Sequence, residues 1–281
     1  MNILNLCGKI DQKSLAIYGA VKQVSLELDI PFVVVGASAR DLVLYYGYGA
    51  RIRRATEDID FGFFLKGWDK YELLNKYLIN AGFQNTKQKQ RLLYDGKVVD
   101  LVPFGLIQDE EAKIAWPPDG DVVMNVMGFQ EALEDTVDVI IQENPEIRIP
   151  VVMPPGLSLL KIISWTDRAA NLRNRDAKDL LYLFKSYKEI PEIRETMFGH
   201  PEIMEEFDHE IEIGSAFILG VNAGAIASRQ TREYLAQIGN NKLAKRPCNL
   251  LIEDMCEDIE EEFQKNRVLL NAYFRGINHK N

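Results

Sequence analysis

Asp58 and Asp60, two carboxylates one residue apart, are the side chains of this sequence best suited to chemistry. The alternation from Ile59 to Phe64 predicts a strand, on which residues two apart face the same side. Two carboxylates held side by side repel each other unless a cation lies between them. Mg²⁺ takes hard oxygen ligands and shares its shell with water and substrate phosphates. The spacing therefore predicts a magnesium site.

A third carboxylate, Asp100, interrupts the apolar run from Val98 to Val102. This run is the second arm of a hairpin predicted over residues 91–103, with Asp95 and Gly96 as its turn. A charge in an apolar strand is unfavourable unless it serves a site. Three strand carboxylates could hold two metal ions, which would clamp the attacking and leaving oxygens of a nucleotidyl transfer. Taken singly, the Asp-x-Asp pair also fits a turn, and Asp100 fits a solvated edge strand.

A glycine and a serine are placed to contact phosphate. The run from Phe32 to Val35 predicts a buried strand, and Gly36 predicts a tight turn at its end. A helix is predicted over residues 40–48. The backbone N–H groups of the turn and the Ser38 hydroxyl would then lie where a helix begins, which is where anions bind.

The elements that must position these residues form a mixed α/β half followed by helices, so the predicted fold class is α+β. Pro154-Pro155 is typical of a first helical turn. The remaining predictions are helices over 11–29, 71–81, 176–187 and 250–274, a strand over 149–153, and a loop over 108–121.

Composition excludes several classes of protein. The chain has 281 residues and a formal net charge of −9, which is not the footprint of a non-specific nucleic-acid coat. Its three cysteines form no CxxC pair, which argues against a disulfide scaffold or a zinc ribbon. Three scattered histidines make a Ser-His-Asp hydrolase a poor fit. We expect a cytoplasmic protein without a membrane contact, because no signal segment and no apolar run of about 18 residues is present.

The order of Gly36 and Ser38, then Asp58 and Asp60, then Asp100 resembles the nucleotidyltransferase superfamily of DNA polymerase beta. Two later segments, 161–168 and 175–180, narrow the resemblance. They look like the Lys…Arg…Lys-Asp helices of AbiEii/AbiGii-type toxin nucleotidyltransferases. Lys161 and Arg168 are seven residues apart and share a helix face, as triphosphate contact would require. An exposed, salt-bridged helix pair is the alternative for these residues.

The resemblance implies a mixed sheet flanked by helices in a catalytic domain over 1–190, with a helical domain over 191–281. It implies Mg²⁺, in two copies, and an NTP as substrate. The metal ligands would be Asp58, Asp60 and Asp100, with Asp179 orienting the site. The implied nucleotide-binding residues are Gly36, Ser38, Arg40, Lys161 and Arg168.

The acceptor is the least constrained part of this hypothesis. The resemblance implies a tRNA end or a protein hydroxyl as acceptor, with a cognate antitoxin as partner. The acidic chain also suits a cationic small molecule, as in aminoglycoside-modifying nucleotidyltransferases. A catalytically silent relative that binds a nucleotide is a further alternative. The chain departs from the family pattern in two places. Ala37 stands where a second glycine or serine is usual, and a long segment before Asp58 carries Arg51, Arg53 and Arg54, which suit phosphate, RNA backbone or a charged surface.

Overall fold

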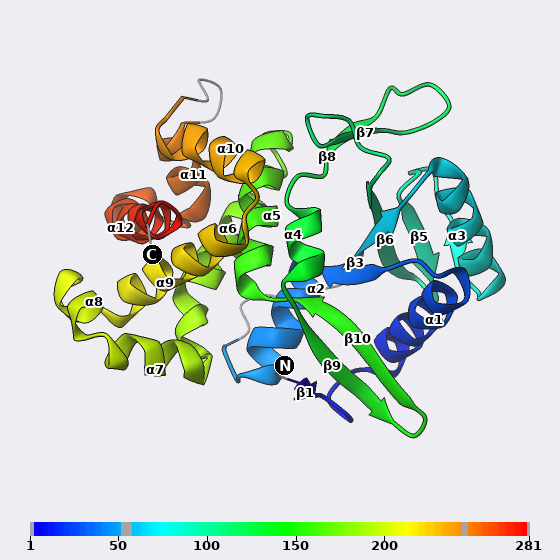
Figure 1. Cartoon of the computed structure of the whole chain (residues 1–281), viewed down its shortest axis with the longest axis horizontal. Helices are drawn as coiled ribbons and strands as arrows, with labels where there is room; N and C mark the ends of the chain where they lie inside the picture. Colours follow the sequence, from blue (N-terminus) through cyan, green and yellow to red (C-terminus); the bar gives the residue numbers. More distant parts are fainter. Residues whose placement is uncertain (1–2, 52–57, 243–246, 280–281) are drawn as a thin grey trace. The chain divides into compact units, whose positions relative to one another are not determined.

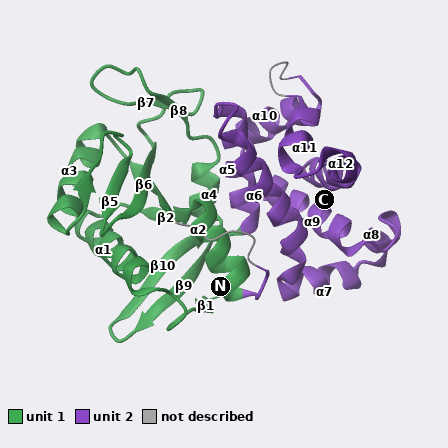
Figure 2. Cartoon of the chain, turned by 180° about the vertical axis from the view of Figure 1, so that it is seen from behind, with its two compact units in different colours: residues 1–47, 52–153 green, residues 48–51, 154–281 purple. Residues whose placement is uncertain are grey.

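A computed structural model describes residues 3–51, 58–242 and 247–279 of the chain (Figure 1). The chain forms two compact units, which we describe separately (Figure 2). The first comprises residues 1–47 and 52–153, and the second comprises residues 48–51 and 154–281. The catalytic domain predicted over 1–190 therefore extends beyond the first unit, which ends before the prolines at 154 and 155. As statements about function, the domain limits at 190 and 191 stay predictions.

The first unit is built on one mixed sheet of eight strands among the described residues. The central strands β2 and β3 are antiparallel, and β3 is parallel to β6. In spatial order the strands are β1 (Ile3–Asn5), β9 (Thr136–Glu143), β10 (Glu146–Val152), β2 (Phe32–Val35), β3 (Ile59–Leu65), β6 (Lys97–Gly105), β5 (Arg91–Tyr94) and β4 (Gln84–Asn85).

Helices cover both faces of this sheet, as the alternation along β3 demonstrates. Phe61 contacts Tyr18 of α1 (Gln12–Leu28), with ring centroids 6.0 Å apart. The next residue, Gly62, faces Phe129 of α4 (Phe129–Glu134). Because neighbouring strand residues face opposite sides, α1 and α4 lie on opposite faces of the sheet. Helix α3 (Trp68–Asn80) lies beside α1 (Figure 1).

Most predicted elements of this unit are confirmed. The helix predicted over 11–29 is α1, and the Asp11 side chain caps it by accepting from the Ser14 N–H. Asp95 and Gly96 form the predicted hairpin turn, both with positive φ. The helix predicted over 40–48 begins earlier, as α2 (Gly36–Arg40), and continues as a π-helix (Asp41–Gly47).

Two predictions for this unit were incomplete. The loop predicted over 108–121 contains β7 (Lys113–Ala115), which pairs with β8 (Val123–Asn125) in a separate two-stranded sheet. The predicted strand 149–153 is the end of β10, whose partner β9 was not predicted. β7 lies beside the strong loop signals at Pro117, Pro118 and Gly120. β9 has the β-branched alternation of a strand, so its signal was overlooked.

The second unit is helical, as predicted for the end of the chain. Helix α9 is apolar and crosses α12 so closely that a Cβ on Gly220 would overlap the Tyr273 carbonyl oxygen. The segment 250–274 contains two helices, because the first ends at Met255 and Asp258 caps the second by accepting from the Glu260 and Glu261 N–H groups. The helices are α5 (Pro154–Asp167), α6 (Arg173–Ser186), a 3₁₀ turn (Tyr187–Glu189), α7 (Pro191–Gly199), α8 (Pro201–Glu206), α9 (Ile211–Ile226), α10 (Arg229–Gly239), α11 (Cys248–Met255) and α12 (Ile259–Ile277). Among the described residues, none of these helices combines the length and apolarity needed to span a membrane.

Candidate active site

Asp60 and Asp100 occupy directly opposite positions on the parallel strands β3 and β6. Paired residues of neighbouring strands face the same side of a sheet. Asp60 is two residues before Gly62, so both carboxylates face the side of the sheet that α4 covers. Asp58 lies immediately before β3 and is half-buried. The sheet therefore brings Asp60 and Asp100 to one face, with Asp58 at the start of the same strand.

Gly36 is required where it stands, because β2 delivers it against Asp60. Val35 of β2 pairs with Asp60 of β3, so the turn after β2 lies beside this carboxylate. Gly36 has φ +71°, and a Cβ atom there would overlap the Asp60 carboxylate. Glycine meets both demands, since it has no Cβ and adopts positive φ without strain.

A cation from the protein already lies among the three acids. Arg91 of β5 is opposite Asp100 of β6, and its Nε and Nη2 donate to the two carboxylate oxygens at 2.7 and 2.6 Å. The pKa of Arg91 is raised, first by its hydrogen bond to Asp100, with the charges of Asp100, Asp58 and Asp60 adding to the shift against the opposing effect of burial. Arg91 therefore lies in the combined field of all three acids.

The oxygen donors of this group suit a divalent cation. Carboxylate oxygens are the donors that Mg²⁺ takes. Both Asp100 oxygens accept from Arg91, however, and among the described residues no three acidic, histidine or cysteine side chains converge as a ligand set. The donor chemistry therefore fits one metal ion at Asp58 and Asp60 more directly than two ions on three acids.

A cavity of about 130 Å³ opens beside Asp58. Its lining includes Ser38 and Asp41, and also Asp11 and Lys97. The Ser38 hydroxyl donates to the Val35 carbonyl at 3.2 Å. This places the hydroxyl at the turn where the sequence predicted phosphate contact.

The buried Arg40 guanidinium binds its neighbour Asp41, with Nε and Nη2 at 2.8 and 2.7 Å from Oδ1. Asp41 also lines the cavity beside Asp58. Arg40 thus reaches this region through an ion pair, and its direct contact with a nucleotide stays a prediction.

The predicted residues of the second unit form a charged cluster between α5 and α6. Lys161 Nζ lies 2.6 Å from Asp179 Oδ2 and 3.2 Å from Asp176 Oδ1. Arg168 Nε lies 2.7 Å from Asp176 Oδ2 and 2.9 Å from the Ser164 hydroxyl. Lys161 and Asp176 are both buried. The predicted helix-face pairing is present, but as a buried network and not as the exposed pair considered in the alternative.

Arg91 and Asp176 were not predicted as site residues, although the sequence pattern around each could have indicated its place. A two-residue turn at 95 and 96 fixes the hairpin register, which places Arg91 opposite Asp100. Asp176 precedes Asp179 by three residues and so shares its helix face. Of the arginines predicted to bind phosphate, Arg51 is exposed, whereas Arg53 and Arg54 lie outside the described residues.

A mixed sheet with aspartates facing one side of neighbouring strands, beside a glycine turn that begins a helix, is the site expected of a nucleotidyltransferase, and the chain is one. Residues 23–219 match the family described as nucleotidyl transferase AbiEii toxin, type IV toxin–antitoxin system. The chain belongs to this family. The match spans both charged clusters.

Comparison with solved structures gives weak likenesses. The antibiotic-resistance factor ANT(2'')-Ia is 10% identical, with a TM-score of 0.37, over 71% of this chain and 99% of its own. The CCA-adding enzyme of Thermotoga maritima, in complex with tRNA, is 13% identical, with a TM-score of 0.27, over 96% of this chain and 83% of its own. No curated protein matches the chain. The family assignment therefore rests on the sequence match.

Proposed function

We propose that this nucleotidyltransferase transfers a nucleoside monophosphate from an NTP to an acceptor hydroxyl, with Mg²⁺ held by Asp58 and Asp60. The observation that carries the proposal is the strand register that brings Asp60 and Asp100 to one face of the sheet beside the Gly36 turn, with Asp58 at the start of β3. Carboxylates held side by side repel one another. They are explained if a divalent cation and the phosphates that it carries complete the site.

The reaction has a simple balance. The acceptor oxygen forms a bond to the α-phosphorus, the bond between that phosphorus and the β-phosphate oxygen breaks, and pyrophosphate leaves with the electron pair. The acceptor hydroxyl loses its proton in the same step. When bound, Mg²⁺ would supply charge stabilisation at the phosphate oxygens.

The chain's own residues would position the substrate. Gly36 lets the turn after β2 lie against the Asp60 carboxylate, and the Ser38 hydroxyl, which would contact phosphate, is held at the same turn. Asp100 would accept the acceptor proton only after one of its oxygens is released by Arg91, so the two side chains would act as a pair. The phosphate contacts predicted for Lys161 and Arg168, and the orienting role of Asp179, stay predictions.

The family membership supports a role as the toxin of a toxin–antitoxin pair, with an antitoxin as partner. The acceptor would then be a tRNA end or a protein hydroxyl. Growth arrest on expression of the wild-type chain, relieved by Asp58→Ala, is the expected result in cells. An expressed, folded chain without any effect on growth would contradict the toxin role while leaving the transferase intact.

The transferase itself is tested by label transfer. We expect Mg²⁺-dependent transfer from at least one α-³²P-NTP to total tRNA or to protein, with aminoglycosides as the third acceptor class. An Asp58→Asn/Asp60→Asn double variant should lose the label. Label on an aminoglycoside would mean that the acceptor is a small molecule and not tRNA or protein. Undiminished label in the double variant would contradict the assignment of Asp58 and Asp60 to the active site.

A further inference from the structure

Lys97 lines the cavity beside Asp58 and has no part in the reaction as described so far. It is the first residue of β6, directly after the turn at Asp95 and Gly96. Because β3 and β6 are parallel, their first residues lie at the same end of the sheet. The hairpin therefore delivers Lys97 to the end of the sheet where Asp58 precedes β3.

The Lys97 ammonium is more deeply buried than the acid that pairs with it. The Lys97 side chain is 18% exposed, whereas that of Asp11, at 3.5 Å, is 61% exposed. The ammonium also donates to the Ser14 hydroxyl at 2.6 Å. An ion pair with so exposed an acid contributes little to stability, and an ammonium has three N–H donors. Lys97 is thus a half-buried charge that a further anion would stabilise.

The size of the cavity limits what that anion can be. Its volume of about 130 Å³ is well below the range of about 300–1,000 Å³ that is typical of sites enclosing a drug-sized ligand. The cavity can therefore take one end of a nucleotide but not the whole of it. A phosphate is small enough and carries the charge that Lys97 attracts, and the Ser38 hydroxyl lines the same space.

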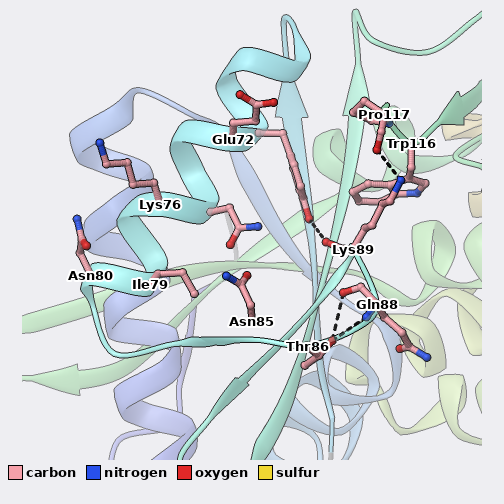
Figure 3. A pocket seen from close by; sticks show the side chains of 12 residues that line it. Glu72, Lys76, Ile79, Asn80, Asn85, Thr86, Gln88, Lys89, Trp116 and Pro117 are labelled. Atoms are coloured by element: carbon pink, nitrogen blue, oxygen red, sulfur yellow. Dashed lines mark hydrogen bonds between the residues drawn. The ribbon is translucent and has the colours of Figure 1, made fainter. Parts of the chain in front are cut away.

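A larger groove beside α3, of about 580 Å³, is separate from this cavity, since the two linings share no residue. Figure 3 shows Glu72 and Lys76 on the helix side of the groove and Lys89 on the other side. Lys89 donates to the Pro117 carbonyl at 2.5 Å (Figure 3). Among the described residues, the groove lining includes no acid of the sheet cluster. Lys97 is therefore better placed than the lysines of the groove to act together with a metal-bound phosphate.

The position of Lys97 along β6 indicates which phosphates it would meet. In the proposed reaction, the α-phosphorus lies near Asp60 and Asp100, which pair across β3 and β6. Lys97 precedes Asp100 by three residues, a rise of about 10 Å along a strand. A phosphate at Lys97 is therefore displaced from the reaction centre, as the two phosphates that leave as pyrophosphate must be.

We propose that Lys97 binds the two outer phosphates of the NTP, and then the departing pyrophosphate, by donating N–H groups to their oxygens. This inference rests on the transferase proposed above, because it adds a substrate-binding residue to that site. Ser14 is a positioning residue in this account, since its hydroxyl accepts from the same ammonium. The alternative is a structural role, in which Lys97 only joins the hairpin to α1 through Ser14 and Asp11.

Equilibrium binding to the full chain tests Lys97 without relying on turnover. A fluorescent non-hydrolysable NTP analogue is titrated in the presence of Mg²⁺, and unlabelled NTP, NMP and inorganic pyrophosphate compete with it. Lys97→Met keeps most of the aliphatic stem and removes the ammonium. We expect this variant to bind NTP and pyrophosphate about tenfold more weakly, the scale of one charged hydrogen bond. Its affinity for NMP should be unchanged, because NMP lacks the outer phosphates.

Lys13→Met is the matched control for this substitution. Lys13 also joins α1 to the hairpin, through an ion pair with Asp95 at 3.0 Å, but it does not line the cavity. Lys13→Met should therefore keep the wild-type affinity for all three competitors. Similar losses in the two variants, or an equal loss of NMP and NTP affinity in Lys97→Met, would make Lys97 a structural residue and overturn the proposal. A lowered melting temperature of Lys97→Met with wild-type NTP affinity would do the same.

Label transfer separates a failure of this proposal from a failure of the transferase. Lys97→Met should raise the KM for the NTP by about the factor by which binding weakens, with a smaller change in kcat. Transfer by Lys97→Met equal to that by Lys13→Met at low NTP would overturn the role of Lys97 and leave the transferase intact. NTP binding that depends on Lys97, without transfer to any acceptor, would contradict the transferase and leave Lys97 as a phosphate-binding residue. A folded wild type that binds no NTP would overturn both.

Discussion

The two charged clusters of this protein differ in their surroundings. On the sheet, Asp100 pairs with Arg91, and Asp58 lines a cavity of about 130 Å³ together with Ser38. Between α5 and α6, each of two cations lies within 3.2 Å of an acid of the same cluster. Carboxylates beside a cavity can meet a cation and the phosphates that it carries. We therefore expect the sheet cluster to bind a ligand and the helical cluster to stabilise the fold.

The largest effect that separates the clusters is expected at Asp60. Asp60→Asn should lower transfer at least about a hundredfold, the scale seen when one charge-stabilising group is removed. The free energy of unfolding should change little by comparison, because asparagine keeps the size of the side chain and relieves repulsion from the neighbouring acids. Label transfer and urea unfolding measure the two quantities.

Asp138→Asn is the matched control for that substitution. Asp138 is also a half-buried strand aspartate of this sheet, and it lies 3.5 Å from Arg148. It should leave transfer intact. Equal losses of transfer in the two variants would mean that the sheet needs its aspartates for folding and not for catalysis.

Asp176→Asn should have the opposite pattern in the helical cluster. Asp176 is 2% exposed and contacts both Lys161 and Arg168, so Asp176→Asn removes a buried charge that both cations share, although Lys161 keeps Asp179 at 2.6 Å. We expect a loss of about 3 kcal/mol in the free energy of unfolding. Glu233→Gln, which breaks the exposed pair with Arg229, should cause no measurable change in the same urea titration. An Asp176→Asn variant as stable as the wild type would show that the helical cluster does not stabilise the fold, and would favour a ligand-binding role for it.

Gly36→Ala sharpens the comparison at the edge of the sheet site. The new Cβ would overlap the Asp60 carboxylate and strain a residue at φ +71°. Gly8→Ala is matched to it, because Gly8 has φ +76° and open space around the missing Cβ. Backbone strain alone is about 1 kcal/mol, so Gly8→Ala should lose about that much stability and no transfer. Gly36→Ala should lose about 2 kcal/mol and transfer as well. Equal losses of stability and transfer in the two variants would contradict the argument that Gly36 is needed for close approach to Asp60.

Arg91→Gln tests whether the arginine shares the role of a metal cation. The hydrogen bonds to Asp100 are partly exposed, so the expected loss of stability is about 1 kcal/mol. Without the guanidinium the three acids repel more strongly, and added Mg²⁺ should raise the melting temperature of the variant more than that of the wild type. A smaller Mg²⁺ effect in the variant would mean that Arg91 orders the metal site and does not compete with it.

Substitution of Asp11 should have the smallest effect on stability and transfer, because its carboxylate already has hydrogen-bond and charge partners. Burial acts to raise its pKa, but hydrogen bonds from Ser14 and the nearby Lys97 ammonium lower the pKa below its usual value. An acid with a depressed pKa stabilises the fold at neutral pH and loses this contribution as the pH falls through its folded pKa. Asp11→Asn should cost less than about 1 kcal/mol at pH 7, with no loss of transfer. In thermal melts, the difference in stability between Asp11→Asn and the wild type should shrink toward acid pH. A difference that does not change with pH would contradict a lowered pKa of Asp11.

The sequence predicts the sheet site better than its surroundings. Gly36, Asp60 and Asp100 could be placed because each breaks the apolar pattern of a strand or ends one, and strand pairing brings such positions together. Arg91 could have been found from the hairpin register. The strand β9 could also have been predicted, because its β-branched run leads through the short turn at Asn144 and Pro145 into β10. Its pairing with β1 could not, because β1 is distant in sequence.

The helical cluster is harder to predict for a physical reason. The spacing of Lys161 and Arg168 on one helix indicates a shared face but not what faces it. Packing of α6 against that face buries Asp176 and turns a predicted phosphate site into an ion-pair network.

Direct metal binding tests the central claim that the sheet cluster around Asp58 and Asp60 is the cation site. Mg²⁺ is titrated calorimetrically into the chain in the presence of a non-hydrolysable NTP analogue, with the wild type, Asp58→Asn/Asp60→Asn and Asp11→Asn compared. Our account predicts saturable binding that is lost in the double variant and kept in Asp11→Asn, although Asp11 lines the same cavity as Asp58. Undiminished Mg²⁺ binding by the double variant would contradict it.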